Sequence, residues 1–175
     1  LRKAIEINPN FAEAHYNLGN ILKELNQIQD AEFSYQKAIA ISPNFAEAYS
    51  SLGRLLINKG LLEQGELALI KATQINPNII TNYLNQGMNY QLQGQIHKSN
   101  ESFNNVLRLA KNDSGEALQA KVHLAVNHLT EGNFKEVEEN IYKFREMIKK
   151  GGLENITSKT NKRHIAARSN YLNHL

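Results

Sequence analysis

Hydrophobic side chains recur along the chain every three to four residues, the spacing that places them on one face of an α-helix. Two such faces follow one another near the start: Ala14, Leu18, Ile21, Leu22 and Leu25, then Ile28, Ala31, Tyr35, Ala38 and Ile39. The pattern predicts helices near residues 12–25, 28–41, 46–59, 62–75, 80–93, 96–111, 115–131 and 134–150. We expect no β-strand within residues 12–150.

The three prolines of the sequence, Pro9, Pro43 and Pro77, follow one another at intervals of 34 residues. The segment 8–14 returns without a gap at 42–48, and in weaker form from residue 76. A fixed period of this size indicates a repeat protein, in which each unit is a pair of antiparallel helices. Such a pair cannot bury its apolar faces alone, so neighbouring pairs must stack. We therefore predict an all-α solenoid of stacked antiparallel helical hairpins.

Glycines occupy two sets of equivalent positions in the units. The first set, which Asn26 joins, follows the first helix of each unit, where a left-handed residue ends a helix: Asn26, Gly60, Gly94 and Gly132. The second set lies inside the first helix: Gly19, Gly53 and Gly87. Glycine inside a helix costs about 1 kcal/mol relative to alanine. We expect a close approach of the paired helices to offset that cost.

These residues resemble the tetratricopeptide repeat, whose pattern is Trp-x-x-Leu-Gly-x-x-Tyr, Ala-x-x-x-Phe and Pro. The first unit matches it with His15, Leu18, Gly19, Leu22, Ala31, Tyr35 and Pro43. The second unit departs where Gly65 replaces the alanine, and the third where Gln86 replaces the leucine and Lys111 the proline. The resemblance implies a right-handed α–α superhelix whose concave face, formed by the first helices, binds proteins or peptides.

The resemblance covers roughly residues 1–150 and implies a division of the chain. We expect the second helix of a truncated repeat at 1–11, repeats at 12–45, 46–79 and 80–111, an insertion at 112–117, a degenerate repeat at 118–151, and a basic C-terminal capping helix or linker at 152–175. The insertion should lengthen the helices or the turn between the third and fourth units. Stacking at that joint should then differ from stacking at the first two.

The run from Asn10 to Asn20 is similar to the repeats of O-linked N-acetylglucosamine transferases and related bacterial proteins. In those arrays an asparagine before the Leu-Gly pair lines the inner surface, and the equivalent column here reads Asn17, Ser51, Asn85 and His123. A carboxamide both donates and accepts hydrogen bonds, so it can bind the backbone of an extended peptide whatever its side chains.

The predicted binding residues lie along the concave face: Tyr16, Asn17, Asn20, Ser51, Arg54, Asn85, Met88 and His123. The face becomes more apolar toward its C-terminal end, with Leu84 and Leu92 in the third unit. Two alternatives stay open, namely that the asparagines contact only water and that the tail buries the apolar end. The columns lack the lysines that a chaperone-type clamp for a C-terminal carboxylate needs, so we reject that subtype.

No group of residues suggests catalysis. The chain has no cysteine, which excludes disulfides and cysteine-metal sites. His123 and His128 are five residues apart on one helix and make a poor metal pair. His15 occupies a packing column, and residues 113–115 indicate a turn that leads into a helix. We expect no enzyme activity, no cofactor and no metal.

Charge is distributed unevenly: residues 1–142 carry 12 basic and 15 acidic side chains, and residues 143–175 carry 8 and 2. The basic tail raises nucleic acid as a partner, but Tyr171 is its only aromatic residue after Phe144, which disfavours stacking on bases. No apolar run approaches the length of a membrane span. We expect a cytoplasmic protein that binds neither membrane nor nucleic acid.

Residues 143–175 allow two interpretations. We expect Gly151-Gly152 to break the preceding helix, and residues 160–175 to form a helix that covers the end of the stack with its Ile165–Leu172 side. The alternative is a linker to a further domain, since a chain that begins at Leu1 without methionine looks like a piece of something longer.

The predicted function is that of a protein-interaction scaffold, which binds a peptide segment or partner protein in the concave groove. The alternative is the substrate-selecting arm of a larger enzyme, such as a glycosyltransferase, whose catalytic domain lies outside this chain. Self-association through exposed repeat ends is a third possibility, because a stack that begins in mid-repeat leaves a helix face uncovered.

Overall fold

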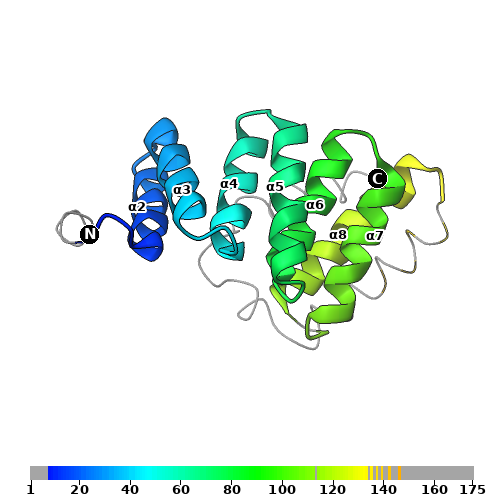
Figure 1. The fold of residues 1–175 in the computed structure, drawn as a ribbon. Helices are drawn as coiled ribbons and strands as arrows, with labels where there is room; N and C mark the ends of the chain where they lie inside the picture. Colours follow the sequence, from blue (N-terminus) through cyan, green and yellow to red (C-terminus); the bar gives the residue numbers. More distant parts are fainter. Residues whose placement is uncertain are drawn as a thin grey trace. The chain divides into compact units, whose positions relative to one another are not determined.

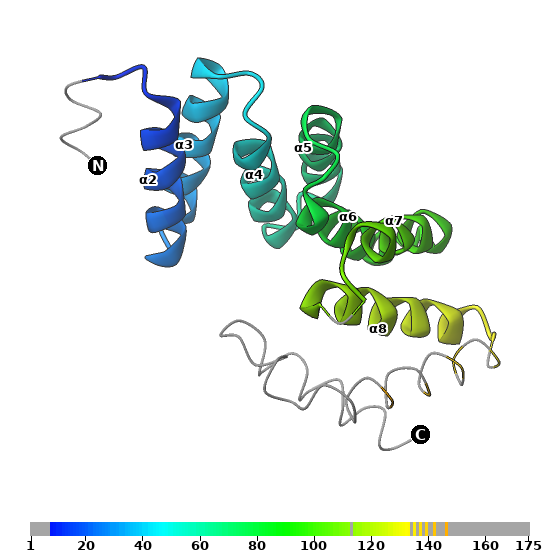
Figure 2. The same cartoon turned by 90° about the horizontal axis from the view of Figure 1, so that it is seen from below.

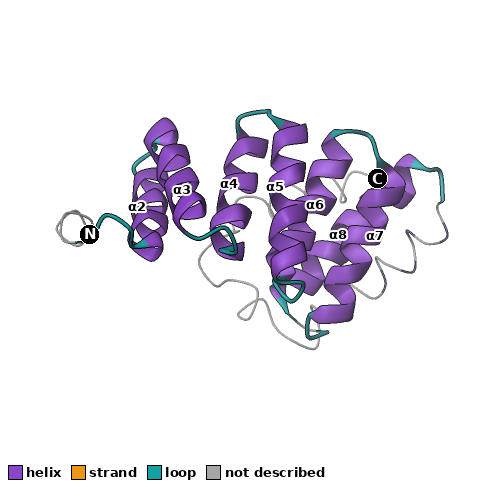
Figure 3. Cartoon of the chain, viewed as in Figure 1, coloured by secondary structure: helices purple, strands orange, loops and turns teal. Residues whose placement is uncertain are grey.

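The computed structural model describes residues 8–112 and 114–133, together with five single residues between 135 and 146. In this part of the chain all regular structure is helical, and no strand is present (Figure 3). The helices are α2 (Ala12–Glu24), α3 (Ile28–Ile41), α4 (Ala46–Asn58), α5 (Leu62–Ile75), α6 (Ile80–Leu92), α7 (Ile96–Leu109) and α8 (Gly115–Thr130). Each ends within two residues of its predicted bounds. The predicted helices in 1–7 and 160–175, and most of 134–150, lie outside the described residues.

The chain divides into two compact units, residues 1–109 and 110–175. In the first unit three hairpins follow one another, α2 with α3, α4 with α5 and α6 with α7 (Figure 1). The second helix of one hairpin packs on the first helix of the next, and α4 also contacts α6. The helix direction changes from hairpin to hairpin (Figure 2). The predicted all-α solenoid of helical hairpins is confirmed.

In the second unit, α8 has 16 residues, whereas the first helix of each earlier hairpin has 13. Its N-cap is Ser114, whose side chain accepts a hydrogen bond of 3.2 Å from the Ala117 amide. A helix therefore begins at Gly115, as the sequence predicts, and it is longer than its counterparts, which agrees with the lengthening expected from the insertion. The changed stacking between the third and fourth repeats stays a prediction.

The first helices end as the sequence predicts. Asn26, Gly60, Gly94 and Gly132 all have positive φ, between 59° and 81°. The residue after each one bonds back across the turn, as in the 2.8 Å bond from the Gln27 amide to the Leu22 carbonyl. This left-handed residue closes the helix and starts the return of the chain.

The glycines inside the first helices mark close contacts with the second helices. A Cβ on Gly19 would lie 2.6 Å from Cε1 of Tyr35, and one on Gly87 would lie 2.5 Å from Cε1 of Phe103. Both aromatic residues are fully buried, so their rings cannot move aside at low cost. The expected close approach is confirmed.

In the second hairpin, glycines face each other across the two helices. A Cβ on Gly65 would lie 2.5 Å from Cγ1 of Ile57 and 2.9 Å from the carbonyl oxygen of Gly53. The equivalent position holds Ala31 in the first hairpin and Ser99 in the third, where the Ser99 hydroxyl donates to the Gly87 carbonyl at 2.9 Å. Gly65 is thus a packing requirement of this hairpin.

The buried side of α6, the first helix of the third hairpin, carries several polar side chains. Gln86, which replaces the leucine of the repeat pattern, is buried and donates to the Thr73 hydroxyl at 3.3 Å. Asn89 donates to the Leu62 carbonyl at 3.1 Å. Asn82 occupies the position of Ala14 and Ala48, is fully buried, and has no hydrogen-bond partner for either side-chain polar atom among the described residues.

Gly65→Ala should lower the free energy of unfolding by about 1 kcal/mol, although it restores the residue of the repeat pattern. Overpacking typically costs about 1–3 kcal/mol, which exceeds the gain of about 1 kcal/mol in helix propensity. Urea unfolding followed by circular dichroism measures the difference. Gly115→Ala is the control, because nothing lies within 4 Å of its added Cβ. A Gly65→Ala protein as stable as the parent would contradict this account.

Asn82→Ala should raise the free energy of unfolding by about 1 kcal/mol, because a buried polar group without a partner costs about 1–3 kcal/mol. Alanine fits this place in the repeat, as Ala14 and Ala48 show. The measurement is the shift of the thermal and urea midpoints relative to the parent. Destabilisation by Asn82→Ala would mean that the side chain makes a contact worth more than its burial penalty.

Candidate functional site

Seven of the eight predicted binding residues lie on the first helices of the three hairpins: Tyr16, Asn17 and Asn20 on α2, Ser51 and Arg54 on α4, and Asn85 and Met88 on α6. We call the surface that α2, α4 and α6 present the first-helix face. Asn17 and Arg54 are exposed, and the other five are half-buried. His123 lies on α8 in the second unit and is only 5% exposed.

The hydroxyl of Tyr35 organises the polar groups of the first hairpin. It projects from α3 past Gly19 and donates a 2.8 Å hydrogen bond to Oδ1 of Asn20 on α2. Burial raises the pKa of Tyr35, and nearby Arg54 together with a hydrogen bond from Ser51 offsets part of that rise. The side-chain oxygen of Asn20 is thereby engaged, and its NH₂ group is the side chain's hydrogen-bond donor.

Tyr16 is held in place by aromatic contacts. Its ring centroid lies 6.0 Å from that of Tyr35 and 5.0 Å from that of Phe45, the residue before α4. These contacts join the first hairpin to the second, beside a core of Ala31, Tyr35, Leu52, Leu55 and Leu56. Tyr16 therefore contributes a fixed, half-buried edge to the first-helix face.

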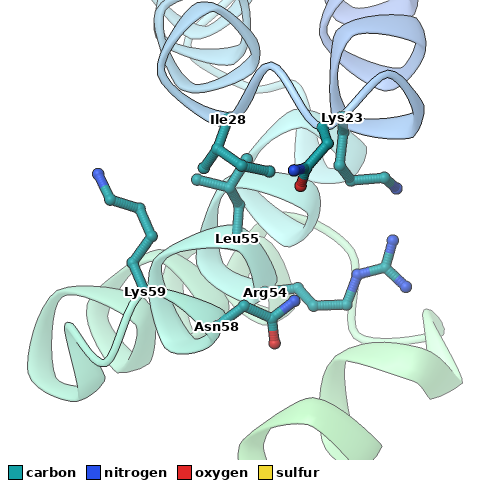
Figure 4. A pocket seen from close by; sticks show the side chains of 7 residues that line it. Lys23, Ile28, Arg54, Leu55, Asn58 and Lys59 are labelled. Carbon is teal, nitrogen blue, oxygen red and sulfur yellow. The ribbon is translucent and has the colours of Figure 1, made fainter.

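A pocket of about 300 Å³ lies where the last turn of α2 meets the last turns of α4. Figure 4 shows Ile28 and Leu55 facing each other, with Lys23 and Arg54 on one side of this contact and Lys59 on the other. Lys59 forms an ion pair with Glu32. Burial lowers the pKa of Lys23, Arg54 lowers it further, and Glu24 partly opposes both.

Two sequence-based interpretations need correction. Leu84 is only 5% exposed, so it belongs to the core and not to the groove; the apolar character of that end comes from exposed Leu92 and half-buried Met88. His15, expected in the core, is half-buried, and its Nε2 donates to the Pro9 carbonyl at 3.0 Å. A ring nitrogen that bonds the preceding turn cannot also point into the core.

In the described part of the chain, no group of three or more His, Asp or Glu residues could hold a metal ion. No helix there is long and apolar enough to cross a membrane.

Sequence reasoning missed one polar residue of this region, Tyr35. Tyr35 was assigned to packing alone, but its column reads Tyr35, Leu69 and Phe103, so only the first hairpin has a hydroxyl there. That difference is a usable signal. No sequence signal predicts that Lys23 lines a pocket together with residues of α4, because that arrangement depends on how two hairpins stack.

The fold places the chain among the helical-hairpin repeat proteins, and two family models identify the repeat. Both models describe the tetratricopeptide repeat, one matching residues 12–45 and the other residues 34–66. Residues 12–66 therefore match the tetratricopeptide repeat. No curated protein sequence gives a significant match.

Solved structures share the fold at low sequence identity. The chain is similar to a crystal structure of MamA, with 22% identity over 85% of each chain and a TM-score of 0.78. It is also similar to MamA 41-end from Desulfovibrio magneticus RS-1, with 20% identity, a TM-score of 0.76, and coverage of 85% of this chain and 81% of that one. For pilF of Pseudomonas aeruginosa the identity is 23%, the TM-score 0.74, and the coverage 83% and 65%. At these identities the likeness is one of fold alone.

Tyr35→Phe should lower the free energy of unfolding by about 1 kcal/mol at neutral pH, since it removes the hydrogen bond to Asn20. Helicity should not change, because the ring still fills its place against Gly19. Chemical denaturation of the parent and the variant measures the loss. Equal stability would show that water replaces the bond without cost.

The pH dependence supplies a second readout of Tyr35. Its pKa is raised in the folded protein, whereas an unfolded tyrosine ionises near pH 10. Above that pH the unfolded chain binds fewer protons than the folded one, so the free energy of unfolding falls as pH rises. Tyr90, whose pKa burial and Glu66 raise to about 12, adds to the fall in both proteins. The fall should be shallower in Tyr35→Phe.

Proposed function

We propose that this chain is a protein-interaction scaffold that binds an extended segment of a partner protein along the first-helix face. The observation that carries the proposal is the repetition of small polar groups at equivalent places on consecutive helices. Asn17, Ser51 and Asn85 follow one another at intervals of 34 residues, and each keeps some exposure. Such groups bind a peptide backbone by donating and accepting hydrogen bonds.

The spacing of these groups suits an extended peptide. Packed neighbouring helices lie about 8–10 Å apart, and an extended chain advances about 3.3 Å per residue. α4 contacts α6 directly, so this spacing applies to that pair of first helices, and the repeat period of 34 residues suggests a similar spacing between α2 and α4. A bound segment would then meet one polar group about every third residue, which leaves its other side chains free.

Rigidity of the face also favours binding. Asn20 is oriented by Tyr35, and Tyr16 is held by Tyr35 and Phe45. Side chains that are already ordered lose little entropy when a ligand arrives. The resemblance of residues 10–20 to the repeats of O-linked N-acetylglucosamine transferases points to the same use of Asn17. An arm that selects substrates for a larger enzyme stays a hypothesis, and it would bind through the same face.

The test begins with a displayed library of short unstructured peptides selected against the whole chain. For the best binder, replacing both Asn17 and Asn85 by alanine should weaken binding by about 1–2 kcal/mol, because each lost amide contact has a net value of that order. Isothermal titration calorimetry measures the affinity, and circular dichroism checks that helicity is unchanged.

Asn104→Ala is the matched control, since Asn104 is an exposed asparagine on the second helix α7. It should bind like the parent. Failure to select any peptide, or a double variant that binds as tightly as the parent, would reject the proposed function.

A further inference from the structure

The pocket between the first two hairpins contains two cations without an ion-pair partner among the described residues. Of its three basic residues, Lys59 is paired with Glu32. Neither Lys23 nor Arg54 forms an ion pair within 4 Å in the described part of the chain. The two come from different hairpins, Lys23 from α2 and Arg54 from α4, and extend on the same side of the pocket (Figure 4).

The two cations are close enough to disfavour each other. Arg54 contributes to the lowered pKa of Lys23, and partial burial contributes more. Glu24 is the acidic group that acts on Lys23, and its effect is the smallest of the three. Two like charges at a partly buried place are unfavourable without a counter-charge. An anion bound between them would offset both the repulsion between the two cations and the cost of their partial burial.

The rest of the pocket suits a carboxylate on a short aliphatic stem. Asn26 and Asn58 line it with carboxamide groups that can donate hydrogen bonds. Ile28 and Leu55 supply an apolar surface beside the charged groups. Arg54 can hold a carboxylate through two parallel hydrogen bonds, which lysine alone cannot do.

We propose that Lys23 and Arg54 bind the side-chain carboxylate of an internal Glu or Asp in the partner segment. This inference rests on the proposed function and gives that segment its chemistry, an acidic residue at the junction of the first two hairpins. A segment that reaches both Asn17 on α2 and Asn85 on α6 crosses the α2–α4 junction. The group it places there therefore comes from within the segment and not from its C-terminus.

The charge of the first unit favours a single acidic side chain over a polyanion. Residues 8–109 carry seven Lys or Arg and eight Asp or Glu side chains, so this part is close to neutral. Nucleic-acid binding depends on many cations that act together. Here the attraction is local to one pocket.

The test uses two peptide libraries that are identical except for one internal position, fixed as Glu in one and as Gln in the other. We expect tighter binders from the Glu library. The best one is then synthesised as a Glu and Gln pair with amidated ends, which removes the terminal carboxylate. Lys23→Gln and Arg54→Gln should each weaken binding of the Glu peptide about tenfold or more. The Gln peptide should bind the parent and both variants equally, and the salt dependence should be shallower for the variants.

Lys71→Gln is the matched control, because Lys71 is exposed on the second helix α5. Lys23→Arg keeps the charge and should retain binding, which separates a lost charge from a disturbed fold. Melting curves of every variant complete that check.

The inference is overturned if the variants lose the same affinity for both peptides, or if amidating the C-terminus abolishes binding while Glu→Gln has no effect. In either case the proposed function stands when Asn17→Ala and Asn85→Ala together still weaken binding. If neither library yields a binder, the inference and the proposed function fail together.

Discussion

The close contact of two helices at a glycine is the constraint on which each hairpin depends. Without a Cβ at Gly19, the ring of Tyr35 lies directly against the backbone of the first helix. The same contact recurs between Gly87 and Phe103. It sets the separation and register of the paired helices, and thereby the places where side chains of the first helix emerge. The loss of about 1 kcal/mol in helix propensity is offset by this packing.

The three hairpins keep that contact and use it differently. The first places a buried hydroxyl behind Asn20 of the first-helix face, because its packing residue is Tyr35 and not Leu69 or Phe103. The second has glycine on both sides, with Gly53 opposite Gly65. The third buries polar groups, of which Gln86 and Asn89 bond to residues of α5, whereas Asn82 has no hydrogen-bond partner in the described part of the chain. Repetition of the backbone therefore does not imply repetition of the surface.

Stacking creates properties that no hairpin has alone. Tyr16 packs on Phe45, at the start of the next hairpin, and Lys23 comes near Arg54. The first contact stabilises the joint, whereas the second leaves two positive charges without an ion-pair partner in the part of the chain that the structure describes. A partner segment that crosses the joint can supply the missing charge, which makes the boundary between hairpins a place where specificity can arise.

The sequence by itself determined the helices, their ends and their pairing. These depend on local or periodic signals: apolar spacing, a left-handed residue after each first helix, and glycines at a constant interval. It also predicted which helices bear Asn17, Ser51 and Asn85, because repeats place equivalent residues on equivalent faces. The tertiary structure alone decided that the Tyr35 hydroxyl reaches Asn20, that Leu84 is buried, and that His15 bonds Pro9. Such contacts depend on side-chain rotamers and on the rotation between neighbouring helices, and residues distant in the sequence set both.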